Sequence, residues 1–426
     1  MQFKYGLDER PPAGAMLLFG LQWFAVTIPI LVIIGKITAG FHFESPEEEI
    51  LYLQKLTFMM AIALFAQVLA GHRLPLIIGP STVLLIGIIS SSKFGADAIY
   101  TSIMAGGLLL SLLSITGLFG HLRRLFTTRV VAAVLLLIAF TLTPTILNLI
   151  TSPQAGHGAT ANLSFAVPVL FAMFVLYRYS RGIWKSTVII WAMILGSLIY
   201  SLLFPDTRAP ASILHGPLLA GWMNHLTSWT VDIGVLISFA FCYLALAAND
   251  LGSIQSMNDL LKASDQPRRL TRGIFVTGLA NIFAGLLGVI GPVNFSLSPG
   301  IIASTRCASR LTLLPTAFML LLLSFSPAAV MLLDAVPAVM IGCVLLFILC
   351  AQIAAGLTLV MESPEGFQFE TGLILGLPIL LGTVTAFLPS DILDAFPAIL
   401  WPIVGNGFVI GVTVALVLEH LIFRKA

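Results

Sequence analysis

The chain has 426 residues, of which 58% are hydrophobic and only 9% are charged, and its net charge is +2. Soluble domains carry roughly 25% charged residues because water must wet their surface, so this composition excludes a soluble globular protein. No basic stripe with interleaved aromatic residues occurs, which argues against nucleic acid as a partner. The four cysteines form no CxxC pair. We therefore expect packing roles for them and no metal or other cofactor.

A membrane-spanning helix needs about 20 largely apolar residues, because lipid offers no partner for backbone polar groups. The N-terminal apolar segment lacks the cleavage site of a signal peptide, so we expect it to remain as the first span. We predict fourteen spans, with the third and tenth short and broken, and a long outer connection over 204–228. The predicted spans lie near residues 14–38, 52–70, 76–92, 98–118, 130–149, 162–177, 185–203, 229–248, 271–289, 295–304, 312–333, 337–360, 371–388 and 398–422.

The basic residues indicate the orientation of these spans. With a cytoplasmic N-terminus, only Lys36, Lys55, Lys93 and Arg208 of the 21 lysines and arginines fall on the outer side. The positive-inside rule predicts this asymmetry, and a wrong number of spans would blur it. We therefore expect a multi-pass protein of the cell inner membrane, embedded in the lipid bilayer, with both termini in the cytoplasm.

Two interrupted segments, 76–82 and 288–294, resemble one another. Each has an aliphatic run, then Gly-Pro, then small polar residues. The first lies in the third of the first seven spans, and the second enters the third of the last seven. An odd number of spans in each half gives the halves opposite orientations. The pattern predicts an all-α fold built as a 7+7 inverted repeat, with short extended stretches and half-helices in spans 3 and 10.

These interruptions are candidates for the binding site. Gly79-Pro80 and Pro299-Gly300 break the helical hydrogen bonding, and we expect the freed main-chain groups to line a polar cavity. Half-helices that begin near Pro80 and Pro299 would direct their positive dipole ends at it. The alternative is a simple kink, because Gly and Pro are common in membrane helices. Two interruptions at equivalent positions of a repeat favour the binding site.

Span eight contains a cluster of polar residues. Asn249 and Ser253 share one helix face, and the amide of Asn249 offers both a donor and an acceptor. Asp250 points about 100° away from Asn249. It is a candidate for proton coupling if buried, or a helix-end carboxylate solvated by the cytoplasm, and the sequence leaves both open.

Spans ten and one add further candidates. Phe295 is placed to stack on a flat ring, or else it packs against lipid or the core. Ser296 and Ser298 follow it in span ten. Gln22, the lone amide of span one, either forms a helix–helix hydrogen bond or lines the cavity.

Several motifs together resemble those of a known family. They are Gly20-Leu21-Gln22-Trp23, Gly71-His72-Arg73-Leu74-Pro75, Ser298-Pro299-Gly300 followed by Thr305-Arg306, and Gly405-Asn406-Gly407. Over almost its whole length the chain resembles the nucleobase:cation symporter family, which includes uracil/xanthine permeases and nucleobase–ascorbate transporters. It differs from the family pattern at the positions whose side chains, in the family, bind the base and couple transport to protons. Trp23 and Ser253 stand where His is usual, Asn249 replaces Glu, Leu297 replaces Gln or Glu, Ser298 replaces Asn, and Thr82 replaces an aromatic residue.

The resemblance implies a core domain and a gate domain that move against each other, often in a homodimer. The core would comprise 1–129 and 229–333, and the gate 130–228 and 334–426. The substrate would lie between spans one, three, eight and ten. The candidate substrate-binding residues are then Asn249, Ser253, Ser298, Leu297, Phe295, Ser296, Thr82, Ser81, Ala25 and Gln22.

Three functions remain open at this point. The first is a secondary transporter of a nucleobase-like solute of the uracil/xanthine class, coupled to a proton or another cation. The second is an uncoupled facilitator or an anion carrier on the same fold, because the usual carboxylate and amide positions hold Asn249 and Leu297. The third is a non-transporting sensor or an enzyme. An enzyme is not expected, because the spans contain no converging acid–base, nucleophilic or metal-binding set.

Overall fold

The computed structural model describes residues 3–43, 45–117, 125–152, 158–181, 183–204, 227–295, 298–363, 366–393 and 395–423. In these ranges eight helices are long and apolar enough to cross a membrane, and shorter apolar helices accompany them. The chain is thus a multi-pass helical membrane protein. Most of the predicted outer connection, 205–226, lies outside the described residues.

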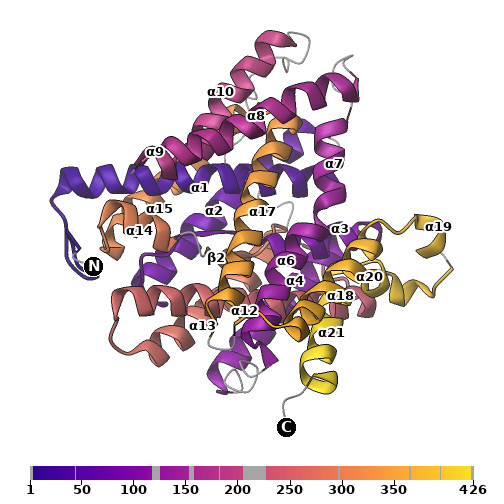
Figure 1. Ribbon diagram of the computed structural model, residues 1–426. Helices are drawn as coiled ribbons and strands as arrows, with labels where there is room; N and C mark the ends of the chain where they lie inside the picture. Colours follow the sequence, from indigo (N-terminus) through magenta and orange to yellow (C-terminus); the bar gives the residue numbers. More distant parts are fainter. Residues whose placement is uncertain are drawn as a thin grey trace.

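Figure 1 shows the helices coloured and labelled in chain order. The first half contains α1 (Ala13–His42), α2 (Pro46–Leu69), α3 (Thr82–Ser90), α4 (Ala96–Ile115), α6 (Thr128–Thr141), α7 (Thr143–Thr151), α8 (Ala159–Tyr179), α9 (Ile183–Ser186) and α10 (Val188–Leu203). The second half contains α12 (Ile233–Leu261), α13 (Gln266–Leu286), α14 (Ser298–Thr305), α15 (Leu313–Ser324), α16 (Pro327–Asp334), α17 (Ala338–Met361), α18 (Phe369–Ala386), α19 (Ser390–Leu393), α20 (Trp401–Val404) and α21 (Gly407–Val417).

Local sequence explains where several helices begin. Pro46 occupies the first turn of α2, where a missing N–H costs nothing, and Glu47 to Glu49 complement the positive end of its dipole. Asp232 caps α12 by accepting a hydrogen bond from the backbone N–H of Val235 at 2.9 Å. Ser81 caps α3 in the same way, through the N–H of Leu84 at 3.3 Å.

The two interrupted segments meet as a pair of antiparallel strands, β1 (Ile78–Pro80) and β2 (Pro292–Asn294), with β2 in the middle of the molecule (Figure 1). Gly79 lies opposite Val293. The pairing continues at both ends, where the N–H of Ser81 donates to Gly291 O at 3.0 Å and the N–H of Phe295 donates to Ile77 O at 2.9 Å. The predicted extended stretches and short following helices are therefore present, as β1–α3 and β2–α14.

The strand pair uses part of the main-chain hydrogen-bonding capacity that the two interruptions free. The interrupted backbone at membrane depth must be satisfied within the protein. Here the N–H groups of Ser81 and Phe295 bond across the strand pair, whereas the N–H of Asn294 donates to Asp250 and its carbonyl oxygen accepts from Ser253. The β1–β2 pair, the strand crossing, is therefore a structural link between the two interrupted segments.

The helices pack in two neighbourhoods. In one, α4 packs along α13, and α2 packs against α15 and α1. In the other, α6, α17, α18 and α21 pack together. Glycines allow the closest approaches: a Cβ added at Gly107 of α4 would lie 2.7 Å from the carbonyl oxygen of Gly278 on α13. Small residues at membrane-helix contacts let backbones come this close.

Candidate functional site

A cavity of about 140 Å³ lies beside the strand pair. Its walls come from α1, the β1–α3 junction, α12 and β2 on one side, and from α6 and α17 on the other. Most of the lining is aliphatic, including Ile30 and Ile34 of α1 and Leu345 of α17. Pockets with apolar walls and a few placed polar groups are typical small-molecule sites.

Asn249 is one of the polar residues that line this cavity. Its Nδ2 donates only a long hydrogen bond, 3.5 Å, to the carbonyl oxygen of Asn294. No described residue donates a hydrogen bond to its side-chain oxygen. The Asn249 amide therefore keeps an acceptor and a donor for a solute, because a primary amide has two donor hydrogens and a carbonyl acceptor.

Phe295 supplies the aromatic surface of the cavity. Its ring lies directly on Gly79, because a Cβ added to Gly79 would overlap the Phe295 ring. Glycine is therefore required at this position of β1 by the close approach of an aromatic ring. Ser81 and Thr82 follow in the same wall, and Ser81 is fully buried with its hydroxyl engaged as the α3 cap.

Ser253 and Ser298 are not among the described residues that line the cavity. The hydroxyl of Ser253 donates to Asn294 O at 3.1 Å and to Asn249 O at 2.9 Å. The hydroxyl of Ser298 accepts from the N–H of Ile77 at 3.0 Å and donates to Phe295 O at 3.2 Å. Both serines therefore hold the strand crossing in place.

The remaining candidates lie elsewhere or outside the description. Gln22 is buried in α1 and Ala25 is half-buried there, and neither is among the cavity-lining residues. Ser296 and Leu297 lie outside the described residues.

Asp250 is fully buried, which excludes the solvated helix-end alternative. Its Oδ1 accepts hydrogen bonds from the backbone N–H of Asn294 at 3.0 Å and from Asn294 Nδ2 at 2.6 Å. Its Oδ2 accepts from the hydroxyl of Thr277 on α13 at 2.7 Å. Buried charges need such partners, and here the carboxylate fastens β2 to α12 and α13.

Two further side chains close this contact into a ring. Gln67 of α2 donates to Thr277 Oγ1 at 2.9 Å, and its side-chain oxygen accepts from the N–H of His72 at 3.2 Å. His72 Nε2 lies 3.0 Å from Asn294 Oδ1. Since His72 Nδ1 accepts the N–H of Leu74 at 2.9 Å, the ring proton is on Nε2 and is donated to Asn294. The buried polar ring is thus Gln67, His72, Asn294, Asp250 and Thr277.

The sequence interpretation missed several of these residues. Gln352, on α17, lines the cavity, and its Nε2 lies 3.4 Å from Leu135 O on α6. A lone amide in an apolar helix indicates a functional residue, because placing a polar side chain inside the membrane costs free energy. Gln67 of α2 gave the same signal. His72 belongs to one of the motifs, but its hydrogen bond to Asn294 and that of Thr277 to Gln67 could not be predicted, because these partners are about 200 residues away.

Comparison with known proteins supplies the family. A family model described as a permease family matches residues 14–390. Xanthine permease of Bacillus subtilis (strain 168) is 24% identical over 432 residues, covering 97% of this chain and 95% of the relative. Nucleobase transporter PlUacP of Paenibacillus larvae is 23% identical, covering 93% of this chain and 91% of the relative. Uric acid transporter UacT of Escherichia coli (strain K12) is 20% identical, covering 97% and 87%.

Solved structures share the fold. The transmembrane domain of the cyanobacterial bicarbonate transporter BicA matches with a TM-score of 0.63 and 15% identity, covering 90% of this chain and 98% of that domain. The murine anion transporter Slc26a9 matches with a TM-score of 0.61 and 11% identity, covering 98% of this chain and 69% of that one. The family match spans most of the sequence and agrees with the motifs. The chain belongs to the permease family of xanthine and uracil permeases and is a transporter rather than an enzyme.

Proposed function

We propose that this permease carries a planar, amide-bearing base of the uracil/xanthine class through the cavity beside the strand pair. One observation carries the proposal: the free amide edge of Asn249 and the ring of Phe295 line the same apolar-walled space. The relatives described as xanthine, nucleobase and uric acid transporters support this substrate class.

The chemistry of the two residues suits a base. Neighbouring N–H and C=O groups on the edge of a nucleobase complement the carbonyl and NH₂ of Asn249 in a two-bond pair. The flat face of a base has the shape and polarity to stack on Phe295. Ser81 and Thr82 on α3, and Gln352 on α17, complete the polar lining.

The proposal includes a fourteen-span architecture of two inverted seven-span halves, with homodimers in the inner membrane and both termini in the cytoplasm. The element order supports it. β1–α3 is the third unit of the first half, after α1 and α2, and β2–α14 is the third unit of the second half, after α12 and α13. In this scheme 1–129 and 229–333 form the core, and 130–228 and 334–426 form the gate. The cavity would then lie between the core and α6 and α17 of the gate.

A second candidate is an uncoupled facilitator or anion carrier. No Asp or Glu is among the described residues that line the cavity. Asp250 remains the candidate proton carrier, although its carboxylate is engaged in the buried ring. A proton-coupled carrier would accumulate its substrate when the outside is made acidic, and an uncoupler would abolish this accumulation. An uncoupled carrier would only equilibrate it.

The test is transport by the purified protein in liposomes, with labelled uracil, xanthine and urate. Asn249→Ala should weaken binding by about 5- to 150-fold, because a buried amide contact is worth about 1–3 kcal/mol. Asn148→Ala, at an exposed position of α7, is the matched control and should behave as wild type. Transport of bicarbonate or sulfate in place of the bases would favour the anion carrier and contradict the proposal that the substrate is a base.

A further inference from the structure

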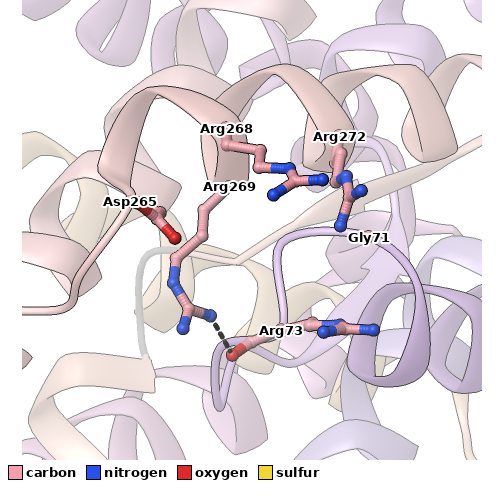
Figure 2. A pocket seen from close by; sticks show the side chains of 6 residues that line it. All are labelled: Gly71, Arg73, Asp265, Arg268, Arg269 and Arg272. Carbon is pink, nitrogen blue, oxygen red and sulfur yellow. Dashed lines mark hydrogen bonds between the residues drawn. The ribbon is translucent and has the colours of Figure 1, made fainter.

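A cluster of arginines surrounds a second pocket, of about 90 Å³, between the start of α13 and the connection from α2 to β1 (Figure 2). Arg268, Arg269 and Arg272 come from the first turns of α13, and Arg73 comes from the connection between α2 and β1. Asp265 is the acidic residue that lines the pocket, so the pocket carries excess positive charge. The N-terminal end of α13 adds its own positive dipole.

Hydrogen bonds among the described residues engage only two of these four arginine side chains, those of Arg73 and Arg269. Arg269 Nη1 donates to the carbonyl oxygen of His72 at 3.1 Å. It also donates to the carbonyl oxygen of Arg73 at 2.9 Å (Figure 2), so it holds the connection in place. Arg73 Nε donates to Leu69 O at 2.9 Å. Within the described ranges, the guanidinium groups of Arg268 and Arg272 have no hydrogen bond or ion pair. They are therefore free to bind an anion.

An apolar groove begins at the same arginines. It lies between α2 and α13, has a volume of about 640 Å³, and is lined by both Arg73 and Arg272. Phe283 in its wall is 56% exposed, and Ile62 opposite is 40% exposed, as expected of residues that face lipid. The groove is otherwise lined by Met59, Ala63, Ala66, Ala70, Phe275, Val276, Leu279 and Ala280.

We propose that the arginine pocket and this groove together form a binding site for one anionic phospholipid. Its phosphate would lie on Arg73, Arg268 and Arg272, and one acyl chain would lie along the groove between α2 and α13. Guanidinium groups bind phosphate oxygens through paired, charge-assisted hydrogen bonds. A free phosphate would use only the pocket and an uncharged lipid only the groove, whereas an anionic lipid satisfies both. Basic pockets between membrane helices bind anionic headgroups on this principle.

The test uses the delipidated full-length protein in uncharged detergent, with added phosphatidylglycerol or phosphatidylcholine. Binding is measured by native mass spectrometry and by the shift in melting temperature, since a ligand of the folded state stabilises it. We expect phosphatidylglycerol to bind more tightly than phosphatidylcholine. Arg272→Gln removes no described hydrogen bond, and it should weaken phosphatidylglycerol binding about five-fold, as should Arg73→Gln. Arg178→Gln, at the exposed end of α8, is the matched control and should change nothing.

A substitution in the groove distinguishes binding of a lipid from binding of a free anion. Ala66→Phe fills the groove without removing an arginine, so it should weaken phosphatidylglycerol binding and leave inorganic phosphate binding unchanged. Equal affinity for phosphatidylglycerol and phosphatidylcholine would overturn the proposal. Equally, if inorganic phosphate competes fully and Ala66→Phe has no effect, the pocket binds a small anion and no lipid. Melting temperatures of the lipid-free variants verify that each is folded.

Discussion

The side-chain amide of Asn294 donates a 2.6 Å hydrogen bond to Oδ1 of Asp250, and the backbone N–H of Asn294 donates to the same oxygen at 3.0 Å. One buried carboxylate thereby fixes both the position and the side-chain orientation of the last residue of β2. Asn294 O in turn lies 3.5 Å from Asn249 Nδ2 at the cavity wall. The buried ring therefore supports the geometry of the candidate site.

Asp250→Asn should destabilise the protein by about 1–3 kcal/mol, because it replaces a charged acceptor of three hydrogen bonds with a neutral amide. Asp250→Ala should cost more, since it also leaves Asn294 and Thr277 without their buried partner. Thermal unfolding of the two variants measures both effects. An Asp250→Asn protein as stable as wild type would show that the carboxylate is not a charged acceptor.

His72 lies between α2 and β1, and burial lowers its pKa from 6.5 to about 3. The nearby positive charge of Arg269 lowers this pKa further, while the hydrogen bond to Asn294 opposes the shift. The folded state therefore disfavours the proton that unfolded His72 takes up below pH 6.5. Stability from this residue is present above pH 6.5 and is lost as the pH falls toward 3, by up to about 1.4 kcal/mol per pH unit.

The measurement is the melting temperature between pH 8 and pH 5. Wild type should lose stability faster on acidification than His72→Gln, because glutamine cannot take up a proton. The difference between the two curves isolates this residue from other titrating groups. Parallel curves would contradict the prediction.

Gly79→Ala should abolish or strongly impair transport, because the added methyl group would overlap the ring of Phe295 and push it from its place in the cavity wall. Gly376→Ala on α18 is the control: its added Cβ meets no atom within 4 Å. Combining Gly79→Ala with Phe295→Leu removes the ring and should recover the wild-type melting temperature. Normal uptake by Gly79→Ala would contradict the proposed contact.

Gln352→Leu should weaken substrate binding by about 5- to 150-fold, because it removes a polar group of the cavity wall and the hydrogen bond that links α17 to α6. Thr358→Ala lies on an exposed face of the same helix and serves as the control. Binding is measured by calorimetry with xanthine or uracil. Unchanged affinity would remove α17 from the binding site.

Gly107→Val should lower the free energy of unfolding by about 1–3 kcal/mol, because α4 and α13 touch through their backbones at this residue. Leu108→Val, at the neighbouring exposed position, should have little effect. Chemical denaturation in detergent provides the comparison. Equal stability of the two variants would contradict the close contact of α4 and α13.

The sequence alone identified a multi-pass helical membrane protein and the two segments at which the helical structure is interrupted, because hydropathy and Gly-Pro pairs are local signals. It also identified Asn249 and Phe295 on the cavity wall, since polar and aromatic residues beside such a break are conspicuous. These predictions needed no knowledge of which segments are neighbours in space.

Only the tertiary structure decided which residues are the hydrogen-bond partners of the buried polar groups. Gly79 lies opposite Val293, and Gln67, His72 and Thr277 join Asp250 and Asn294 in one ring, through contacts that span up to 222 residues. The same chain packing gives the hydroxyls of Ser253 and Ser298 hydrogen-bond partners at the strand pair, and it brings Gln352 to the cavity. Hydrogen bonding of a buried polar group depends on which helices meet there, and residue spacing along one helix does not contain that information.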